Sequence, residues 1–305
     1  MSDFQLTTPV AFIIFNRPDT TERVFAEIAK AKPPKLLVVG DGPRSNRPGE
    51  AEKVAAARAI IQRVDWDCEV LTNFSEVNLG CKRRVSSGID WVFEQVEEAI
   101  ILEDDCLPDP SFFRFCQELL ERYRHDQRIG MISGDNFQFG NRRNDDSYYF
   151  SKYVHIWGWA TWRDRWVNSY DVTIAKWPRI RDEAWLADMV GNAREAAYWT
   201  KIFERVYRGE IDTWDYQWVF ANWVEGRMTI LPSVNMITNI GFDANATHTT
   251  GDSELANLAR YPISFPLKHP SGVFRNTQAD MFSEKKCFRI PLVKRVRNKI
   301  AGWMR

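Results

Sequence analysis

The sequence contains no long apolar run and no excess of charge of either sign. Its longest apolar stretches lie near residues 10–15 and 99–102, far short of the ~20 residues that a membrane-spanning helix needs. The 41 basic and 41 acidic residues leave no formal net charge, which excludes a generally polybasic protein and predicts no nucleic-acid partner. The opening MSDFQLTTPV lacks the basic start and the apolar stretch of a secretion signal. We therefore expect a cytoplasmic protein.

Cysteine is scarce and is not spaced as in a metal or disulfide site. The five cysteines are odd in number, and no two form a C-x-x-C pair. This argues against a disulfide framework or a structural zinc site and predicts reduced thiols. Tryptophan is abundant instead, with 13 copies, many of them between Trp157 and Trp223. These rings form either a large aromatic core or a platform that packs against a ligand.

The first half of the chain alternates continuous apolar runs with helical patterns. Such runs are typical of strands that are buried on both faces, and the alternation predicts an α/β fold with a mostly parallel sheet flanked by helices. The predicted strands cover residues 9–15, 35–40, 68–74 and 99–102, and the predicted helices cover 16–31, 50–63, 82–97 and 108–123.

After Ile129 the pattern becomes mixed. We predict strands at 130–133 and 227–233 and a helical segment near 181–208, and we expect this half to extend the same sheet. The predicted organisation is one domain over 1–255, with a nucleotide-binding half (1–130) and an acceptor half (131–255), followed by a looser C-terminal extension over 256–305.

Three consecutive acids, Glu103, Asp104 and Asp105, directly follow the 99–102 strand. In open parallel sheets, ligands bind outside the carboxyl ends of the strands. Crowded carboxylates repel one another unless a cation lies between them, and Mg²⁺ or Mn²⁺ typically bridges one or two carboxylates to substrate phosphates. The alternative is a solvated acidic turn that caps the next helix.

At this point the sequence resembles the GT-A glycosyltransferases, a Rossmann-like fold class, and particularly those like N-acetylglucosaminyltransferase I. The resemblance covers roughly residues 9–250, and its motifs follow one another in the family's order. They are FNRPDTTERVF (15–25), VVGDGPR (38–44), NLGCKRRVSSGI (78–89), IILEDDCLPDPSFFRF (100–115), MISGDNF (131–137), HIWGWATW (155–162), TWDYQW (213–218) and EGRMTILPSVNMITNIGFDANATHT (225–249).

The resemblance implies roles for the residues around the acidic triplet. It implies that Asp105 binds Mn²⁺ or Mg²⁺ directly and that Asp104 acts on the metal through water or on the sugar. For the nucleotide-sugar donor, the implied residues are Glu103 at the sugar, Asp41 at a uracil ring, Arg17 at the nucleotide, Lys82 and Arg83 at the diphosphate, and His248 at the metal or a phosphate oxygen. Without the resemblance, Asp41 reads equally as part of a turn-forming Asp-Gly pair, and Lys82 and Arg83 read as a solvated basic patch.

Asp215 is the predicted catalytic residue. An inverting transfer needs a carboxylate that removes the proton of the acceptor hydroxyl, and bulky neighbours at 214, 216 and 218 should raise the pKa of this acid. The family has a W-D-D-W segment here, whereas three residues separate Trp214 from Trp218 in this chain, and Asp212 is the second choice. The alternative is that Asp215 only caps the helix that follows.

The segments after 133 and around 155–162 are predicted to form the acceptor site. Asp135 and Asn136 could bond sugar hydroxyls, and His155 belongs to a segment that shapes the same pocket. The predicted acceptor residues are Asp135, Trp157, Trp159, Trp214 and Trp218, the last four through their ring faces.

The end of the chain, 291–305, carries five basic residues and no acid, with apolar residues at helical spacing. This predicts a basic amphipathic helix that either contacts an anionic membrane face peripherally, where a lipid-linked glycan acceptor would be found, or docks on the domain.

These observations predict a metal-dependent inverting glycosyltransferase that moves a sugar from a UDP-sugar, such as UDP-N-acetylglucosamine, to a glycan or lipid-linked acceptor in polysaccharide biosynthesis. The rivals are a sugar nucleotidyltransferase, a glycoside hydrolase and a non-catalytic carbohydrate-binding protein.

Overall fold

The computed structural model describes the chain except for residues 1–3, 243–254, 256 and 289–305. Its centre is one eight-stranded sheet with the strand order β3-β2-β1-β4-β8-β6-β9-β7. The ten strands are β1 (Val10–Ile14), β2 (Lys35–Gly40), β3 (Glu69–Phe74), β4 (Glu98–Glu103), β5 (Cys106–Pro108), β6 (Ile129–Ser133), β7 (Tyr148–Ser151), β8 (Trp159–Trp162), β9 (Met228–Pro232) and β10 (Ile237–Asn239).

Strands β1 to β4 form a parallel half of the sheet, and the second half is mixed. The β1–β2, β1–β4 and β2–β3 pairs are parallel. Strand β8 runs antiparallel to both β4 and β6, β6 and β9 are parallel, and β7 is antiparallel to β9. Strands β5 and β10 form a separate antiparallel pair. The predicted α/β class with a mostly parallel mixed sheet is therefore confirmed.

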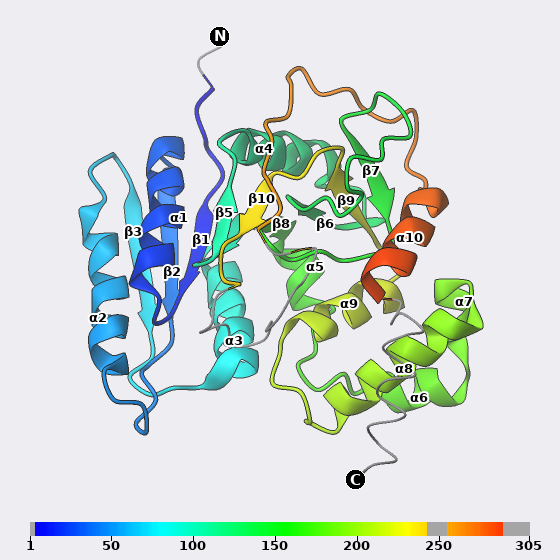
Figure 1. Ribbon diagram of the computed structural model, residues 1–305, viewed down its shortest axis with the longest axis horizontal. Helices are drawn as coiled ribbons and strands as arrows, with labels where there is room; N and C mark the ends of the chain where they lie inside the picture. Colours follow the sequence, from blue (N-terminus) through cyan, green and yellow to red (C-terminus); the bar gives the residue numbers. More distant parts are fainter. Residues whose placement is uncertain (1–3, 243–254, 256, 289–305) are drawn as a thin grey trace.

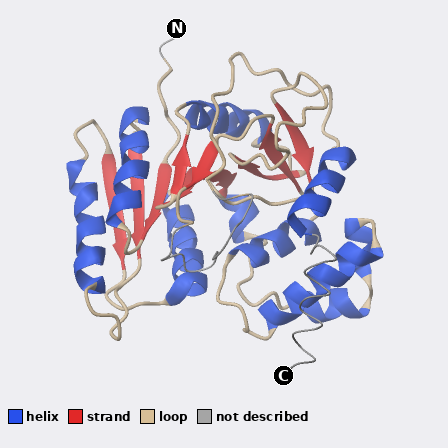
Figure 2. Cartoon of the chain, viewed as in Figure 1, coloured by secondary structure: helices blue, strands red, loops and turns tan. Residues whose placement is uncertain are grey.

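Helices cover both faces of this sheet (Figure 2). They are α1 (Pro18–Ala31), α2 (Glu50–Ile60), α3 (Gly80–Gln95), α4 (Ser111–Tyr123), α5 (Arg163–Val167), α6 (Trp177–Asp182), α7 (Trp185–Val190), α8 (Ala193–Tyr207), α9 (Asp215–Val224) and α10 (Thr277–Ser283), with a 3₁₀ turn at Ile61–Arg63 and a π-helical turn at Glu284–Phe288.

Two apolar cores lie on opposite faces of the sheet, because the strands carry apolar side chains on both sides. Residues of α1 and α4 fill the first core, and residues of α3, α5 and α9 fill the second. A third core joins α6, α7, α8 and α9, and Figure 1 shows the three short or medium helices α6 to α8 grouped beside the sheet.

The predicted elements of the first half are present with small shifts at their ends. The single helical segment predicted at 181–208 is wrong in detail, because the chain forms α6, α7 and α8 there. Ala184 and Gly191 have positive φ angles of 57° and 84° that interrupt the helix, and the Asn192 side chain caps α8 by accepting from Glu195 N.

The described part of the predicted C-terminal extension, 257–288, is packed against the sheet domain. Ile263 and Leu267 belong to the first core, and Arg260 donates to the carbonyl of Pro108 (2.6 Å) and to Glu27 (3.0 Å). Figure 1 shows α10 beside β7, and Ser151 of β7 donates to the buried Asp280 of α10. This stretch is part of the fold and not a loose tail.

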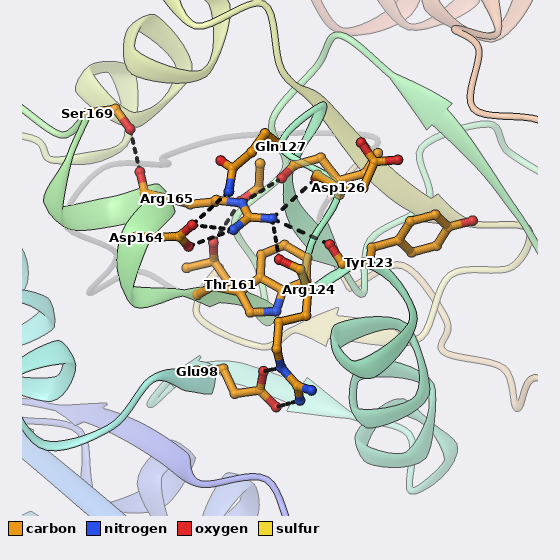
Figure 3. Close-up of polar contacts among 12 residues, drawn as sticks. Glu98, Tyr123, Arg124, Asp126, Gln127, Thr161, Asp164, Arg165 and Ser169 are labelled. Atoms are coloured by element: carbon orange, nitrogen blue, oxygen red, sulfur yellow. Dashed lines mark hydrogen bonds and ion pairs between the residues drawn. The ribbon is translucent and has the colours of Figure 1, made fainter.

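A buried arginine ties α5 to the end of α4 (Figure 3). The Arg165 side chain is 1% exposed. Its guanidinium donates to the carbonyls of Arg124 (2.8 Å), Asp126 (3.2 Å) and Ile129 (3.3 Å) and to the Asp164 carboxylate. It therefore supplies donors to carbonyls in the turn between α4 and β6 that the helix itself cannot satisfy.

Candidate active site

The acidic triplet lies at the C-terminal end of the central strand β4. Glu103 is the last residue of β4, and Asp104 and Asp105 form the turn into β5. The backbone N–H of Phe15, just after β1, donates to Asp104 Oδ2 at 3.0 Å. The sequence places the acids here because the apolar run before them can only be a buried strand, and the ends of neighbouring parallel strands lie at one edge of the sheet.

Arg17 pairs with the last acid of the triplet. Its Nη1 lies 2.7 Å from Asp105 Oδ2, and both side chains are about one-fifth exposed. Arg17 directly precedes α1, whose first residue is Pro18, and this fixes the turn that brings the guanidinium back to β4. The structure therefore brings together two of the predicted donor and metal residues.

The chain after β10 packs directly on this ion pair. Ile240 N donates to the carbonyl of Asp105 at 2.8 Å. A Cβ atom at Gly241 would lie 2.1 Å from Asp105 Oδ2 and 2.7 Å from Arg17 Nη1. Only glycine fits here without moving the pair. The sequence alone does not indicate that Gly241 lies against Asp105. This close approach results from the pairing of β10 with β5.

The protein environment makes the first two acids difficult to ionise. Burial raises the pKa of Glu103 well above its usual value, and the charges of Asp105, Asp104 and Asp215 add to this, while Arg17 opposes it. Burial and Asp105 raise the pKa of Asp104 to about 7, against the opposing effects of Arg17 and the Phe15 N–H. A cation bound at this edge would offset the repulsion.

Asp215 comes from another element but lies near the triplet. It is the first residue of α9, and Thr213 Oγ1 donates to its Oδ1. Its charge contributes to the raised pKa of Glu103 and, after burial and Glu103, to that of the Cys81 thiol. The charge of Asp215 thus acts on the triplet and on Cys81, for which no role was predicted.

Asp212, the second choice for the base, caps α3 instead. Its Oδ1 accepts from Lys82 N at 3.2 Å, and its Oδ2 lies 2.9 Å from where a Cβ of Gly80 would be. Lys82 and Arg83 lie on the first turn of α3, half-buried and exposed respectively. Their binding of a diphosphate stays a prediction.

Asp41 is buried and holds the loop before α3. Its carboxylate accepts from the backbone N–H groups of Gly42 (2.9 Å), Leu79 (2.9 Å) and Gly80 (3.2 Å) and from Asn78 Nδ2 (3.0 Å). Burial raises its pKa, against the lowering effect of these backbone donors. The turn interpretation accounts for these contacts, and uracil binding stays a prediction.

Three of the four predicted acceptor tryptophans belong to the core. Trp159, Trp214 and Trp218 are at most 2% exposed, and Trp159 stacks on Trp214 with ring centroids 5.7 Å apart. The three rings pack against one another and against other core side chains, so the prediction that their faces contact the acceptor is wrong. Trp157 is half-buried and remains a candidate.

Asp135 and Trp157 lie together. Trp157 N donates to Asp135 Oδ2 at 3.0 Å, and the Trp157 ring packs against Phe242, the residue after Gly241 (5.5 Å between centroids). Asn136 bonds within the protein, donating through Nδ2 to the carbonyl of Pro232 at 2.6 Å. His248 lies outside the described residues.

The described residues contain no group of three or more His, Cys, Asp or Glu side chains arranged to hold a metal ion. Mg²⁺ and Mn²⁺ bound with a nucleotide need fewer protein ligands, because water and phosphate oxygens complete the shell. The adjacent carboxylates of Asp104 and Asp105, crowded and partly buried at a strand end, fit an ion of this kind.

The chain is thus an α/β protein with an acidic site at the end of its central strand. No family model matches it, and no curated protein matches it. Among solved structures, it is similar to apo UDP-glucose pyrophosphorylase, with a TM-score of 0.35 and 9% identity over 75% of this chain and 93% of that one. The same enzyme in complex with UDP-glucose gives a TM-score of 0.35 and 9% identity over 74% and 90% of the two chains. Likeness at this level carries no conclusion about activity.

Proposed function

We propose that the chain is an enzyme of nucleotide-sugar chemistry and, more specifically, a metal-dependent inverting glycosyltransferase that uses a UDP-sugar. The observation that carries this proposal is the row of carboxylates Glu103, Asp104 and Asp105 at the end of β4, with Asp215 at the start of α9 near enough for its charge to act on Glu103. A site that binds a donor diphosphate and activates an acceptor hydroxyl needs acids that hold a metal ion and a separate carboxylate that takes a proton.

In this proposal, Asp104 and Asp105 hold Mn²⁺ or Mg²⁺ together with the donor diphosphate. The ion supplies positive charge to the phosphate oxygens of the leaving group. Arg17 orients Asp105 through the 2.7 Å contact, and Lys82 and Arg83 supply further positive charge from the first turn of α3. Glu103 binds a hydroxyl of the donor sugar, and Asp41 supports the loop that borders the nucleotide.

Asp215 acts as the general base. It takes the proton of the acceptor hydroxyl, while the acceptor oxygen forms a bond to the anomeric carbon. The bond from that carbon to the phosphate oxygen breaks, and the nucleoside diphosphate leaves with the electron pair. Thr213 holds Asp215 through Oδ1 and so fixes the direction of the carboxylate at the start of α9.

The test is sugar transfer or donor hydrolysis from UDP-sugars with Mn²⁺. We expect Asp105→Asn and Asp215→Asn to lose activity by a factor of ~10²–10⁴, whereas UDP binding falls only in Asp105→Asn. Asp188→Asn, which changes an exposed acid of α7, is the matched control. Full turnover in Asp105→Asn would remove the metal role, and full turnover in Asp215→Asn would remove the base role.

A sugar nucleotidyltransferase is the second candidate. The Arg17–Asp105 pair and the basic start of α3 would serve a nucleotide triphosphate as well as a nucleotide sugar, and this chemistry needs no base at Asp215 because a sugar phosphate is already an anionic nucleophile. Incubation with UTP, glucose 1-phosphate and Mg²⁺ separates the two: release of pyrophosphate that Asp215→Asn leaves intact would favour this candidate.

Calorimetry with UDP, with and without Mn²⁺, tests the non-enzymatic rival. A carbohydrate-binding protein should be indifferent to both, whereas the proposed enzyme should bind UDP more tightly with Mn²⁺ and lose that gain when EDTA is added. Anomeric hydrolysis of unactivated glycosides would instead indicate a glycoside hydrolase.

Membrane contact through 291–305 is proposed separately, since this stretch lies outside the described residues. None of the helices built from the described residues has the length and apolar character to cross a bilayer. The basic, apolar-spaced sequence of 291–305 supports peripheral binding. Deleting 291–305 should abolish co-sedimentation with anionic liposomes, and unchanged co-sedimentation would end this proposal.

A further inference from the structure

Four aromatic side chains and one carboxylate form a contact group. It is called here the Asp135 cluster and consists of Asp135, Phe137, His155, Trp157 and Phe242. Phe137 stacks on His155, with centroids 4.4 Å apart and planes at 23°. Its ring also meets the Trp157 ring edge-on at 5.2 Å. Trp157 N donates to Asp135 Oδ2, and the Trp157 ring packs on Phe242. The cluster joins the ends of β6, β8 and β10.

Two polar atoms of this cluster are buried without a partner. Asp135 is 1% exposed and His155 is 5% exposed. In the described structure, Asp135 Oδ1 and His155 Nδ1 make no hydrogen bond. An unmatched buried polar atom is costly, and native proteins keep few of them without a reason. Both residues belong to one contact group, Asp135 through the Trp157 backbone N–H and His155 through the Phe137 ring, so the two unmatched atoms point to a bound ligand that supplies their hydrogen bonds.

The cluster adjoins the proposed metal site through the chain that follows β10, because the Trp157 ring packs on Phe242. Phe242 directly follows Gly241, whose backbone packs on Asp105 and Arg17. The triplet and the cluster are therefore neighbouring sites that share this segment of the chain.

The chemistry of the cluster favours an uncharged polar group. Burial lowers the pKa of His155 to about 3 and raises that of Asp135 well above its usual value, so the surroundings disfavour charge on either side chain. A neutral polar site can form hydrogen bonds with an uncharged hydroxyl or amide group. It does not compensate the charge of a phosphate or an ammonium group. A half-buried indole beside neutral polar atoms suits a sugar ring.

We propose that Asp135 and His155 bind an uncharged hydroxyl or acetamido group of a hexose, which lies against Trp157. This inference rests on the proposed function for the source of the sugar, which is either the donor or the acceptor. It names His155 as a ligand-binding residue and the Oδ1 and Nδ1 atoms as the contacts.

The first test observes His155 directly in the full chain by ¹⁵N NMR with labelled histidine. The chain has four histidines, and a His155→Phe spectrum assigns the signal. The probes are UDP, UDP-glucose, UDP-N-acetylglucosamine, and free glucose and N-acetylglucosamine added with UDP. A shift of the Nδ1 signal with a UDP-sugar but not with UDP places the donor sugar in the cluster, and a shift with the free sugars places the acceptor there.

Two results would overturn the inference. The first is that the protein binds UDP but the His155 signal does not shift with any of the saccharides. The second is that, in the free protein, His155 Nδ1 already shares an exchange-protected proton with Asp135. Both polar atoms would then have a hydrogen-bond partner without a ligand. Failure of the proposed function looks different: UDP would not bind, whereas free saccharide would still move the His155 signal.

The second test compares affinities by calorimetry. His155→Phe keeps an aromatic ring against Phe137, slightly larger than the imidazole, and removes the two nitrogens, and Asp135→Leu removes the carboxyl. We expect each to weaken binding of the UDP-sugar, or of the free sugar, at least tenfold while UDP alone binds within twofold of wild type. Thr229→Val, which removes a buried unpartnered hydroxyl from β9, is the control and should bind as wild type does. Equal saccharide affinity in folded His155→Phe would overturn the proposal.

Discussion

His155 shows how strongly one buried position can control protonation. Its imidazole is enclosed by Phe137 and its neighbours, and burial alone lowers its pKa to about 3. An unfolded histidine has a pKa near ~6.5. Between these two values the unfolded chain binds more protons than the folded chain, so this residue makes the fold more stable as pH rises and less stable as pH falls below ~6.5.

We predict that acidification destabilises the wild type relative to His155→Phe. The free energy of unfolding of the wild type relative to that of His155→Phe should fall by about 2 kcal/mol between pH 7 and pH 5, from the proton uptake of the unfolded histidine. Urea denaturation of both proteins at the two pH values measures this. The difference between the two proteins cancels the opposite effects of Glu103, Asp104 and Asp135, whose raised pKa values favour the fold at low pH. A gap independent of pH would contradict the burial argument.

Asp41 is a residue at which the sequence left two interpretations open. The structure gives its carboxylate three backbone donors and the Asn78 amide, which explains why an acid follows β2 whatever the ligand. Removing it would leave the buried N–H of Gly42 and two partly buried N–H groups without acceptors.

Asp41→Ala is predicted to lower the free energy of unfolding by about 3 kcal/mol, because one buried and several partly buried donors lose their acceptor at once. Thermal and urea denaturation measure this, with the exposed Asp145→Ala as the control of equal chemistry. A variant of Asp41 with unchanged stability that no longer binds UDP would instead favour the uracil role.

At the level of elements, Arg165 decides how α5 meets the turn between α4 and β6. The sequence RDRWV reads as an ordinary charged helix, and nothing in its spacing shows which arginine is buried. The position follows from β8, which runs antiparallel between β4 and β6 and delivers α5 beside the end of α4. Figure 3 shows the guanidinium among the backbone carbonyls of this turn.

Arg165→Met is predicted to destabilise the protein by about 3 kcal/mol, because several carbonyls lose a buried donor at once while most of the apolar stem is preserved. The free energy of unfolding in urea measures the loss. Arg179→Met, at an exposed i,i+4 pair with Glu183 on α6, is the control and should change little. Equal effects of the two substitutions would show that the carbonyl contacts carry no stability.

The α6–α8 segment illustrates what a pattern of apolar residues leaves undecided. Its helical character is visible in the sequence, but the division into three helices depends on single residues, Ala184 and Gly191, with positive φ. A Gly-Asn pair at 191–192 is the one local signal of a helix end followed by a new cap. No such signal marks the break at Ala184.

Considered whole, both halves of the chain contribute strands to one sheet, as the expectation that the second half extends the sheet of the first requires. The first core contains residues of β1, β2, β4 and α4 together with residues of β6, β7, β8 and β9. Strand β8, from the second half, pairs with β4, the last long strand of the first. Each half therefore covers apolar surface of the other.

A chain truncated to residues 1–130 is predicted not to fold cooperatively. It would expose the edge of β4 and the apolar face of α4, where Phe112, Phe115 and Leu119 are fully buried in the intact protein. Amide hydrogen exchange and urea denaturation of the fragment, beside the full chain, check this. A soluble fragment with protected amides and a sharp unfolding transition would show that the two halves are separate domains.

The local pattern of the chain was sufficient for the fold class, the order of strands and helices in the first half and the acidic edge of the sheet. Buried parallel strands must be apolar throughout, and polar groups after them must meet at one edge, so these features depend on neighbours in the chain. The contacts of Trp159 with Trp214, of Asp41 with Leu79 and of Gly241 with Asp105 join segments that are far apart in the chain. Whether a ring becomes core or ligand surface, and whether a carboxylate meets a backbone amide or a substrate, is decided by which distant segment packs against it, and residue type alone does not carry that information.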